Sequence, residues 1–363
     1  MNMKKDKTVK IITFHCVPNY GAILQAYALQ KKISEYVETV NILDYKPQNL
    51  IEEYKVINTY SYKSVIMSLL SATTYLKKKK NFKRFEKKYL SLSDKSYHKP
   101  EEIVDDADFY FLGSDQIWNP EITCGFDKVY FADFDRKKES RAVSYAASLG
   151  KGTFSETEIH EFSELLSKLD GISVREDEAK NIIEMKCGKK CEVVLDPTLL
   201  LKKEQWEDLV KKQTRKKYVL LYSLNGYVET EVLAEKVARY SDIELVELSG
   251  RRKPILKKKH EAIYYAGPEE FLSLIYNADY VVTDSFHGTV FSIIFHRPFL
   301  TVPHKTRGGR IKSILNKLEL AERSIVGFDK DIFKKRINWD DVDKKLDLER
   351  EKSIKFIEQQ LGV

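Results

Sequence analysis

Short runs of β-branched and aromatic residues alternate with helical patterns along this chain, and the alternation occurs twice. In the first half, strands are expected at 9–14, 40–44, 109–113, 141–148, 172–174 and 192–195, with helices at 23–33, 156–169 and 177–185. The pattern restarts with strands at 218–224, 243–248, 280–283 and 299–302 and helices at 229–240, 269–278 and 288–295. Strands that alternate with helices indicate parallel sheets joined by helical crossovers. We therefore expect an α/β protein with two such units.

The length of 363 residues fits two domains of ordinary size. A polar, basic stretch separates the two patterns, so we place the domains at residues 1–205 and 206–330. A helical tail at 331–363 is expected to pack back on the first domain. A basic helical segment at about 60–92 interrupts the first pattern. We interpret it as an insert of the first domain, either as an exposed charged helix or as a surface for anionic lipid headgroups.

Composition and short motifs exclude several classes of protein. The net charge of +7 suits an anionic substrate but is modest for a protein dedicated to nucleic acid. The polar start and the lack of a long uncharged run predict a soluble protein of the cytoplasm, and four cysteines predict reduced thiols. The usual glycine-rich nucleotide motifs, the zinc-protease motif and the hydrolase elbow are absent. Cys187 and Cys191 have no second cysteine pair, so we expect no metal site.

The segment 281–292 carries the strongest chemical signal, because a strand runs into a helix through a tight polar turn. Asp284 or Ser285 can cap that helix. The N–H groups of Gly288 and Thr289 are expected to form an anion site at its start. His287 would then stand beside a carboxylate at the carboxyl end of a strand, where α/β proteins bind ligands. The plainer interpretation is that Asp284 caps the helix and His287 packs.

Further polar segments follow other expected strands. They contribute Asn19, Tyr20 and Gly21; Asp115, Gln116, Trp118 and Asn119; Arg175; and the turn at 195–198. A mixture of Asp, Gln, Trp and Asn suits sugar hydroxyls, while Asn19 and Gly21 suit a close backbone approach to a ligand. Each segment taken alone is also consistent with ordinary turn chemistry.

Together these segments resemble the polysaccharide pyruvyl transferase family over about residues 9–325. The resemblance implies two Rossmann-like domains that face a cleft, as in GT-B glycosyltransferases. It also implies transfer of a pyruvyl group from phosphoenolpyruvate to two hydroxyls of one sugar, which makes a cyclic ketal. The acceptor would be a lipid-linked or polymeric glycan of surface or exopolysaccharide biosynthesis. Phosphoenolpyruvate is then a co-substrate, and no cofactor, metal or nucleic acid is expected.

The resemblance also implies roles for individual residues. His287 would be the acid that protonates the donor, with Asp284 in support, and Asp115 would orient or deprotonate an acceptor hydroxyl. Arg175 matches an arginine that binds the donor's carboxylate or phosphate. Ser285, Gly288 and Thr289 would complete the donor site. Acceptor binding would fall to Asn19, Tyr20, Gly21, Gln116, Trp118 and Asn119.

The motif around His287 departs from the family pattern. Better-known members have arginine and leucine where this chain has Ser285 and Phe286. The nearest downstream basic cluster comprises Lys305, Arg307 and Arg310, and we expect Arg307 or Arg310, with Arg175, to replace the missing charge.

Two other classes of function stay open. A GT-B glycosyltransferase that uses a nucleotide sugar would share this architecture, with Glu319 or Glu322 as candidates for contact with ribose. A non-catalytic assembly protein on a glycan or membrane would use the segment 64–88. Peripheral contact with the inner face of the membrane is also compatible with the transferase.

Overall fold

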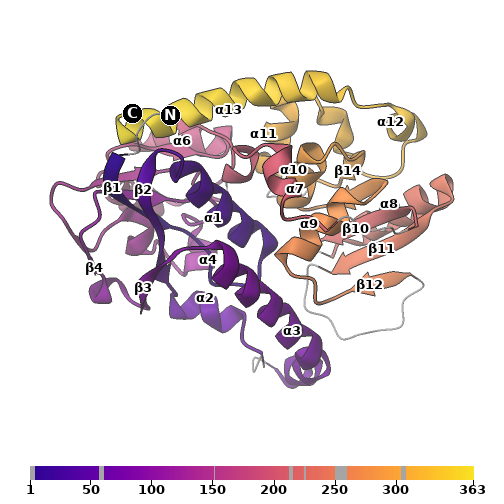
Figure 1. Cartoon of the computed structure of the whole chain (residues 1–363), viewed down its shortest axis with the longest axis horizontal. Helices are drawn as coiled ribbons and strands as arrows, with labels where there is room; N and C mark the ends of the chain where they lie inside the picture. The colour runs from indigo at the N-terminus through magenta and orange to yellow at the C-terminus, as the bar shows by residue number, and fades with distance from the viewer. Residues whose placement is uncertain are drawn as a thin grey trace. The chain divides into compact units, whose positions relative to one another are not determined.

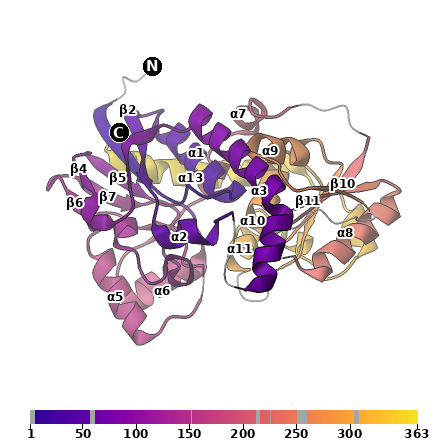
Figure 2. The same ribbon diagram turned by 90° about the horizontal axis from the view of Figure 1, so that it is seen from below.

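The structure is a computed structural model, and it describes residues 5–56, 61–150, 152–211, 216–224, 226–249, 260–303 and 308–363. The chain forms two compact units (Figures 1 and 2). Unit 1 comprises Met1–Tyr54, Glu86–Leu201 and Asp347–Val363, and unit 2 comprises Lys55–Phe85 and Lys202–Leu346.

Unit 1 is built on a parallel sheet of five strands in the order β3-β2-β1-β5-β7. The strands are β1 (Lys5–Ile12), β2 (Val37–Tyr45), β3 (Leu92–Tyr97), β5 (Phe109–Leu112) and β7 (Arg141–Ser144). Read across the sheet, they are the third, second, first, fourth and fifth in the chain, which is the order of a Rossmann-like sheet. Two small parallel pairs join β4 (Val104–Asp105) to β6 (Asp135–Arg136) and β8 (Ser173–Val174) to β9 (Glu192–Val193).

Helices and an aromatic cluster complete unit 1. The α-helices are α1 (Tyr20–Ile33), α2 (Gln48–Glu53), α4 (Pro120–Thr123), α5 (Glu156–Leu166) and α6 (Asp177–Cys187). The 3-10 helices are η1 (Pro100–Glu102), η2 (Lys128–Phe131) and η3 (Pro197–Leu199). Trp118 is fully buried, stacks on Phe131 at 5.4 Å and meets Phe162 edge-on. This cluster fixes the segment that follows β5.

Unit 2 repeats the same sheet order, β12-β11-β10-β13-β14, again with all strands parallel. The strands are β10 (Tyr218–Ser223), β11 (Glu244–Ser249), β12 (Glu261–Ile263), β13 (Tyr280–Thr283) and β14 (Phe299–Thr301). Every residue of β13 and β14 is buried. A run of apolar residues without alternation is typical of a parallel strand that is covered on both faces.

Unit 2 also contains most of the shorter helices of the C-terminal half. They are α7 (Lys203–Glu207), α8 (Val228–Ser241), α9 (Pro268–Tyr276), α10 (Phe286–Ile294), α11 (Gly309–Lys317), η4 (Ala321–Arg323) and α12 (Lys330–Lys334). Trp206 of α7 is fully buried and meets Phe291 of α10 edge-on at 4.9 Å. The sheet and α8 enclose a core that includes Val219, Leu233 and Val282.

The expected α/β class with two Rossmann-like domains is confirmed by these two sheets. The boundaries at 205 and 330 and the cleft stay predictions, because the structure defines each unit by itself. Two strands of the sheets, β3 and β12, were not predicted from the sequence. Both lie at sheet edges and are largely polar or exposed, so neither has an apolar run to mark it.

Two long helices, α3 (Tyr62–Tyr89) and α13 (Trp339–Leu361), each belong partly to both units. We predicted α3 as an insert of the first domain, but residues 55–85 group with unit 2. The Nδ2 of Asn81 donates to the Tyr265 carbonyl at 2.8 Å. The later part of α13 packs in unit 1, where the Leu195 N–H donates to Ser353 Oγ at 2.9 Å.

One lysine of α3 is buried within a run of lysines whose other members are exposed or half-buried. Lys78 is 6% exposed, and burial lowers the pKa of its ammonium group to about 8. The folded state therefore disfavours the protonated form relative to the unfolded chain, where lysine has its ordinary pKa of 10.5. Below pH 8 this penalty is fully present, and it disappears as the pH rises toward 10.5.

We predict that Lys78→Met stabilises the protein at pH 7 by about 2 kcal/mol, since it removes a buried charge and keeps a long apolar side chain. The gain should vanish near pH 10.5. Lys80→Met, at an exposed position on the same helix, is the matched control and should change little at either pH. Thermal unfolding at pH 7 and pH 10.5 measures both. A Lys78→Met variant that is less stable than the wild type at pH 7 would contradict the prediction.

Candidate active site

The predicted site residues gather at one place in each sheet. Both sheets reverse strand order between their two central strands, β1 and β5 in unit 1 and β10 and β13 in unit 2. In open α/β sheets, ligands bind beyond the carboxyl ends of the strands at such a reversal. The segments that follow β5 and β13 carry Asp115 in unit 1 and Asp284, Ser285 and His287 in unit 2.

The turn between β13 and α10 is held by its own polar side chains. The Thr283 hydroxyl donates to the Tyr222 carbonyl at 2.6 Å and accepts from the Ser285 N–H at 3.0 Å. Ser285 is the N-cap of α10, and its Oγ accepts from the Gly288 N–H at 3.3 Å. The Thr289 N–H donates to the Ser285 carbonyl at 3.0 Å.

These bonds change the role that we expected for two backbone groups. The N–H groups of Gly288 and Thr289 were predicted to receive an anion. The structure instead engages both with Ser285, because a serine at this position caps the helix from its own side chain and carbonyl. Ser285 is only 1% exposed, and its hydrogen bonds hold the turn in place.

Asp284 connects this turn to the neighbouring strand β10 through hydrogen bonds. Its Oδ2 accepts from the Ser223 hydroxyl at 2.6 Å, and its Oδ1 accepts from the Leu224 N–H at 2.7 Å. Both partners lie at the end of β10. We had left open whether Asp284 caps α10. Ser285 does so, and the carboxylate of Asp284 fixes the loop that follows β10.

His287 lies in the first turn of α10, directly beyond this network. Its side chain is largely buried, with the residue 7% exposed, and its ring meets Phe286 edge-on at 5.1 Å. Gly288 lets this turn lie close to the sheet, since a Cβ there would stand 2.5 Å from Thr283 Oγ1 and 2.9 Å from Tyr222 Cδ1. The local packing therefore requires glycine after His287.

Arg310 is the cation that the structure places beside this turn. It stands at the start of α11, and its guanidinium carbon lies 5.9 Å from the centre of the Phe286 ring. Phe286 is the residue between Ser285 and His287. The other two cations of the downstream basic cluster, Lys305 and Arg307, lie outside the described residues.

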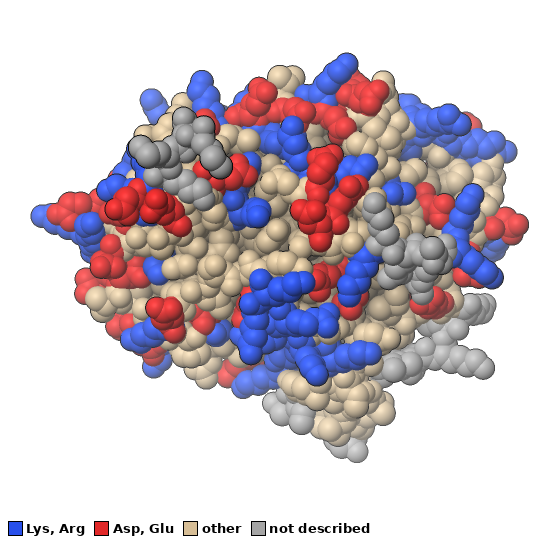
Figure 3. Space-filling model, viewed as in Figure 1, with Lys and Arg blue, Asp and Glu red and all other residues tan. Residues whose placement is uncertain are grey.

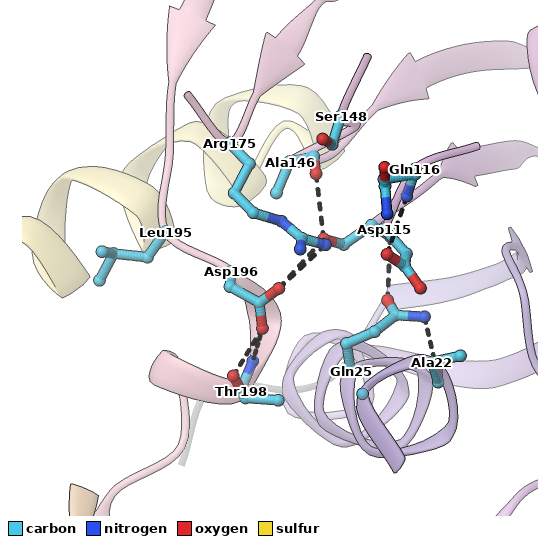
Figure 4. A network of polar contacts seen from close by, with 12 residues as sticks. Ala22, Gln25, Asp115, Gln116, Ala146, Ser148, Arg175, Leu195, Asp196 and Thr198 are labelled. Atoms are coloured by element: carbon cyan, nitrogen blue, oxygen red, sulfur yellow. Dashed lines mark hydrogen bonds and ion pairs between the residues drawn. The ribbon is translucent and has the colours of Figure 1, made fainter. Parts of the chain in front are cut away.

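The corresponding turn of unit 1 follows β5 and is also tightly bonded (Figure 4). Gly113 has a φ of +124°, and a Cβ there would stand 2.3 Å from the Tyr145 carbonyl oxygen, so no other residue fits. The Ser114 N–H donates to Gln25 Oε1 at 3.0 Å, and the Thr13 hydroxyl donates to the Ser114 carbonyl at 3.0 Å. These bonds join the carboxyl ends of β1 and β5 through α1.

A buried ion pair stands over this turn. Arg175 Nη2 lies 3.0 Å from Asp196 Oδ2, and the two side chains are 2% and 0% exposed. The same nitrogen donates to the Ser114 hydroxyl, which donates to the Ala146 carbonyl at 3.0 Å. Asp196 accepts from the N–H and hydroxyl of Thr198 at 2.9 and 2.5 Å. Arg175 is thereby held in one orientation at the end of β8 (Figure 4).

Asp115 lies next to this network in a left-handed conformation, with a φ of 69°. Its Oδ1 accepts from the Gln116 N–H at 2.9 Å, and the residue is 7% exposed. Gln116 Oε1 accepts from Asn119 Nδ2 at 3.1 Å. Asp115, predicted as a catalytic residue, is thus bonded to the backbone of Gln116, predicted to bind the acceptor.

Three other predicted acceptor residues have structural roles. Trp118 belongs to the aromatic core, and its indole N–H donates to the Tyr130 carbonyl at 3.0 Å. Asn119 is fully buried and caps α4 through the Glu121 N–H. Asn19 caps α1 by accepting from the N–H groups of Gly21 and Ala22. Because Trp118 and Asn119 have no exposed surface, the structure does not support their direct contact with a sugar.

The two remaining acceptor residues begin α1. Tyr20 and Gly21 are the first residues of this helix, and both are buried. They directly follow the segment that connects β1 to α1, so they lie on the element that begins at the carboxyl end of β1.

Gln25 is a residue that holds this turn in place and that we did not predict. It is fully buried on α1, and its Nε2 donates to Thr13 Oγ1 and the Ala22 carbonyl, both at 2.8 Å. A signal exists in the sequence, since a glutamine stands within the otherwise apolar run 22–29.

A second buried network in unit 1 lies around Asp44. His15 Nε2 lies 2.9 Å from Asp44 Oδ1, and Lys46 and Ser96 donate to Oδ2. Burial alone would raise the pKa of the Asp44 carboxyl, but the hydrogen bonds from His15, Lys46 and Ser96 hold it well below its usual range. This carboxylate therefore stays ionised and structural.

Among the described residues, one group has the composition of a metal site. Ligand atoms of Glu231, Glu247 and His260 lie within 4.8 Å of one another in unit 2. His260 Nε2 also bonds Glu247 Oε2 at 3.1 Å. This group stands apart from the β13–α10 turn in sequence and contains none of the predicted site residues. Cys187 and Cys191, which we did not expect to bind a metal, are not part of it.

We predict that the buried pair Arg175–Asp196 couples strongly in a double-mutant cycle. Arg175→Met or Asp196→Asn alone leaves one buried charge unpaired and should cost about 3–5 kcal/mol of stability. The double variant should cost at least about 2 kcal/mol less than the sum, because neither charge is then left alone. Denaturant unfolding of all four proteins measures this, and additive losses would show that the pair is not coupled.

Several solved structures are similar to this chain. A UDP-GlcNAc 2-epimerase from Neisseria meningitidis bound to UDP-GlcNAc gives a TM-score of 0.49 at 11% identity, over 98% of this chain and 99% of that chain. UDP-GlcNAc 2-epimerase from Methanocaldococcus jannaschii in complex with UDP-GlcNAc and UDP gives 0.47 at 14%, over 99% of each. A putative UDP-N-acetylglucosamine 2-epimerase from Listeria monocytogenes gives 0.47 at 12%, over 97% and 90%. At these TM-scores the likeness carries no argument about chemistry.

Sequence comparison is more informative. No curated protein matches the sequence. The family model described as polysaccharide pyruvyl transferase matches residues 19–306, which is most of the chain and includes the turns that follow β5 and β13. The chain therefore belongs to the polysaccharide pyruvyl transferase family and is a transferase.

Proposed function

We propose that the protein transfers a pyruvyl group from phosphoenolpyruvate to two hydroxyls of one sugar in a glycan, forming a cyclic ketal. The observation that carries this proposal is His287 in the turn after β13, within the span that the family model matches. The product would belong to a capsule or another surface or exopolysaccharide. The acceptor would be lipid-linked or polymeric, and the reaction would take place in the cytoplasm, with peripheral contact at the inner face of the membrane.

The reaction balances without a further reagent. His287 gives a proton to C3 of phosphoenolpyruvate, so that C2 becomes electrophilic. One sugar hydroxyl adds to C2, the C2–O bond to phosphate breaks, and the second hydroxyl of the same sugar adds in its place. The two hydroxyl protons leave, one to restore His287 and one to the medium or the phosphate. The products are the ketal and inorganic phosphate.

The structure supports a division of roles among the residues. Asp284 and Ser285 position His287, because their bonds fix the turn that carries it. Arg175 and Arg310 would neutralise the anionic groups of the donor, and Arg310 would supply the charge that Ser285 does not. Asp115, whose Oδ2 makes no hydrogen bond to the described residues in the structure, would orient or deprotonate the first acceptor hydroxyl.

The nucleotide-sugar alternative depended on Glu319 and Glu322. Glu319 pairs with Lys345 at 2.6 Å, and Glu322 pairs with Lys335 at 3.1 Å. Both acidic side chains are thus engaged in ion pairs within unit 2. No observation on the described residues favours that alternative.

We predict that His287→Gln lowers turnover about 10²–10⁴-fold, as expected for a lost general acid, without lowering the unfolding temperature substantially. The assay follows phosphate release from phosphoenolpyruvate and a mass gain of about 70 Da on the glycan, which is phosphoenolpyruvate minus phosphoric acid. His160→Gln, at an exposed position on α5, is the matched control and should keep normal turnover. Near-normal turnover of His287→Gln would overturn the acid assignment. Transfer from a nucleotide sugar, with no ketal formed, would overturn the proposal.

A further inference from the structure

In the first half of α3, large apolar side chains are exposed, whereas an ordinary surface helix buries them. Its exposed positions include Ile66, Leu69, Leu70 and Leu76, and Leu69 and Leu70 are 59% and 62% exposed. These residues recur at helical spacing, so they form one stripe along the helix. A protein usually turns such a stripe toward its core.

Apart from Tyr75, the buried positions described in the same half are polar. Ser68, Ser71 and Thr74 are buried, and their turn of helix is followed by the buried Lys78. The Ser71 hydroxyl donates to the Met67 carbonyl at 2.7 Å, and the Thr74 hydroxyl donates to the Ser71 carbonyl at 2.9 Å. The hydroxyls of Ser71 and Thr74 thus bond the backbone of their own helix, so this polar face can pack while the apolar face stays in contact with water.

The exposed stripe continues into a basic half. The exposed positions from 77 onward are Lys77, Lys80, Lys83, Arg84, Lys87 and Lys88. Figure 3 shows a gathering of Lys and Arg over α3, next to an uncharged surface. Acidic groups near this row include Glu269 and Glu270, which lie 3.7 and 3.9 Å from Arg84, and Glu86, which is buried on the same helix. The row therefore keeps a strong excess of positive charge.

The two halves have the chemistry of a helix that lies on a membrane. An interfacial helix buries an apolar face at the boundary of headgroups and acyl chains, and its basic residues meet anionic lipids. From Ile66 to Lys88 the stripe is about 33 Å long, at about 1.5 Å per residue. Among the described residues, no helix is long and apolar enough to cross a membrane.

We propose that the exposed face of α3 is the surface by which the protein binds an anionic membrane. The apolar half enters the interface and the basic half lies on the headgroups. This inference deepens the proposed function, because it names the surface that would bring the protein to a lipid-linked acceptor.

Flotation of the full chain with vesicles tests the proposal. The wild type should float with vesicles of phosphatidylglycerol mixed with phosphatidylcholine, float much less with phosphatidylcholine alone, and be released by 0.5 M salt, at which screening is strong. Leu69→Ser/Leu70→Ser should weaken partition at least about tenfold. Lys80→Gln/Lys87→Gln should weaken it about thirtyfold, with roughly fivefold for each basic residue near an anionic surface.

Matched controls separate the face of α3 from exposed residues in general. Leu348→Ser changes a leucine that is 60% exposed on α13, and Lys138→Gln/Lys190→Gln removes two exposed charges from unit 1. Both controls should bind vesicles like the wild type. Equal losses in the controls and in the α3 variants would overturn the inference.

Two further outcomes would also overturn it. The wild type could fail to float, or it could form a dimer that Leu69→Ser/Leu70→Ser abolishes without any vesicle binding, which would make the face a contact between copies. Turnover with a soluble glycan acceptor is measured in parallel and should be the same for all these variants. If the wild type turns over the soluble acceptor but does not bind vesicles, this inference fails and the proposed transferase activity stands. If the wild type does not turn over that acceptor, the proposed activity fails.

Discussion

Backbone hydrogen bonding at the strand ends is the constraint on which the candidate residues of each unit depend. Where two central strands of a Rossmann-like sheet end, their connections leave in opposite directions and the ladder stops. The backbone groups that emerge are buried and still need partners. In unit 2 the partners are Thr283, Asp284 and Ser285, and in unit 1 they are Thr13 and Gln25.

This requirement explains why so many residues of the family motifs have a structural role. Ser285 and Asn119 accept from N–H groups of the helices that they cap, and Asp284 accepts from the Leu224 N–H. Trp118 anchors its loop in the aromatic core. In the proposed function, the chemistry belongs to a smaller set, which comprises His287, Arg175, Asp115 and Arg310. Each of these stands on a turn or helix start that the structural residues hold in place, which is how a site gains a fixed geometry.

Local periodicity of the sequence was enough to predict the central strands and most of the helices. Buried parallel strands such as β10 and β13 stood out as apolar runs, and α10 was recognised through its polar start. The edge strands β3 and β12 were missed because few of their residues are buried. Properties that arise only in three dimensions were also missed. Gln25 bonds a residue 89 positions away, and Lys78 is buried within a run of lysines. The hydrogen bond that occupies the Gly288 N–H depends on a side-chain rotamer of Ser285 that no motif specifies.

Calorimetric titration of the full chain with phosphoenolpyruvate tests the central claim most directly, because the account assigns the donor to the turn after β13 and to Arg310 beside it. It predicts that phosphoenolpyruvate binds the wild type and binds Arg310→Ala about ten- to a hundredfold more weakly, as expected for the loss of one charge-assisted contact. Arg297→Ala, which removes an arginine stacked over Tyr276 in the same unit, should bind like the wild type. Unchanged binding in Arg310→Ala, or binding of a nucleotide sugar in place of phosphoenolpyruvate, would contradict the account.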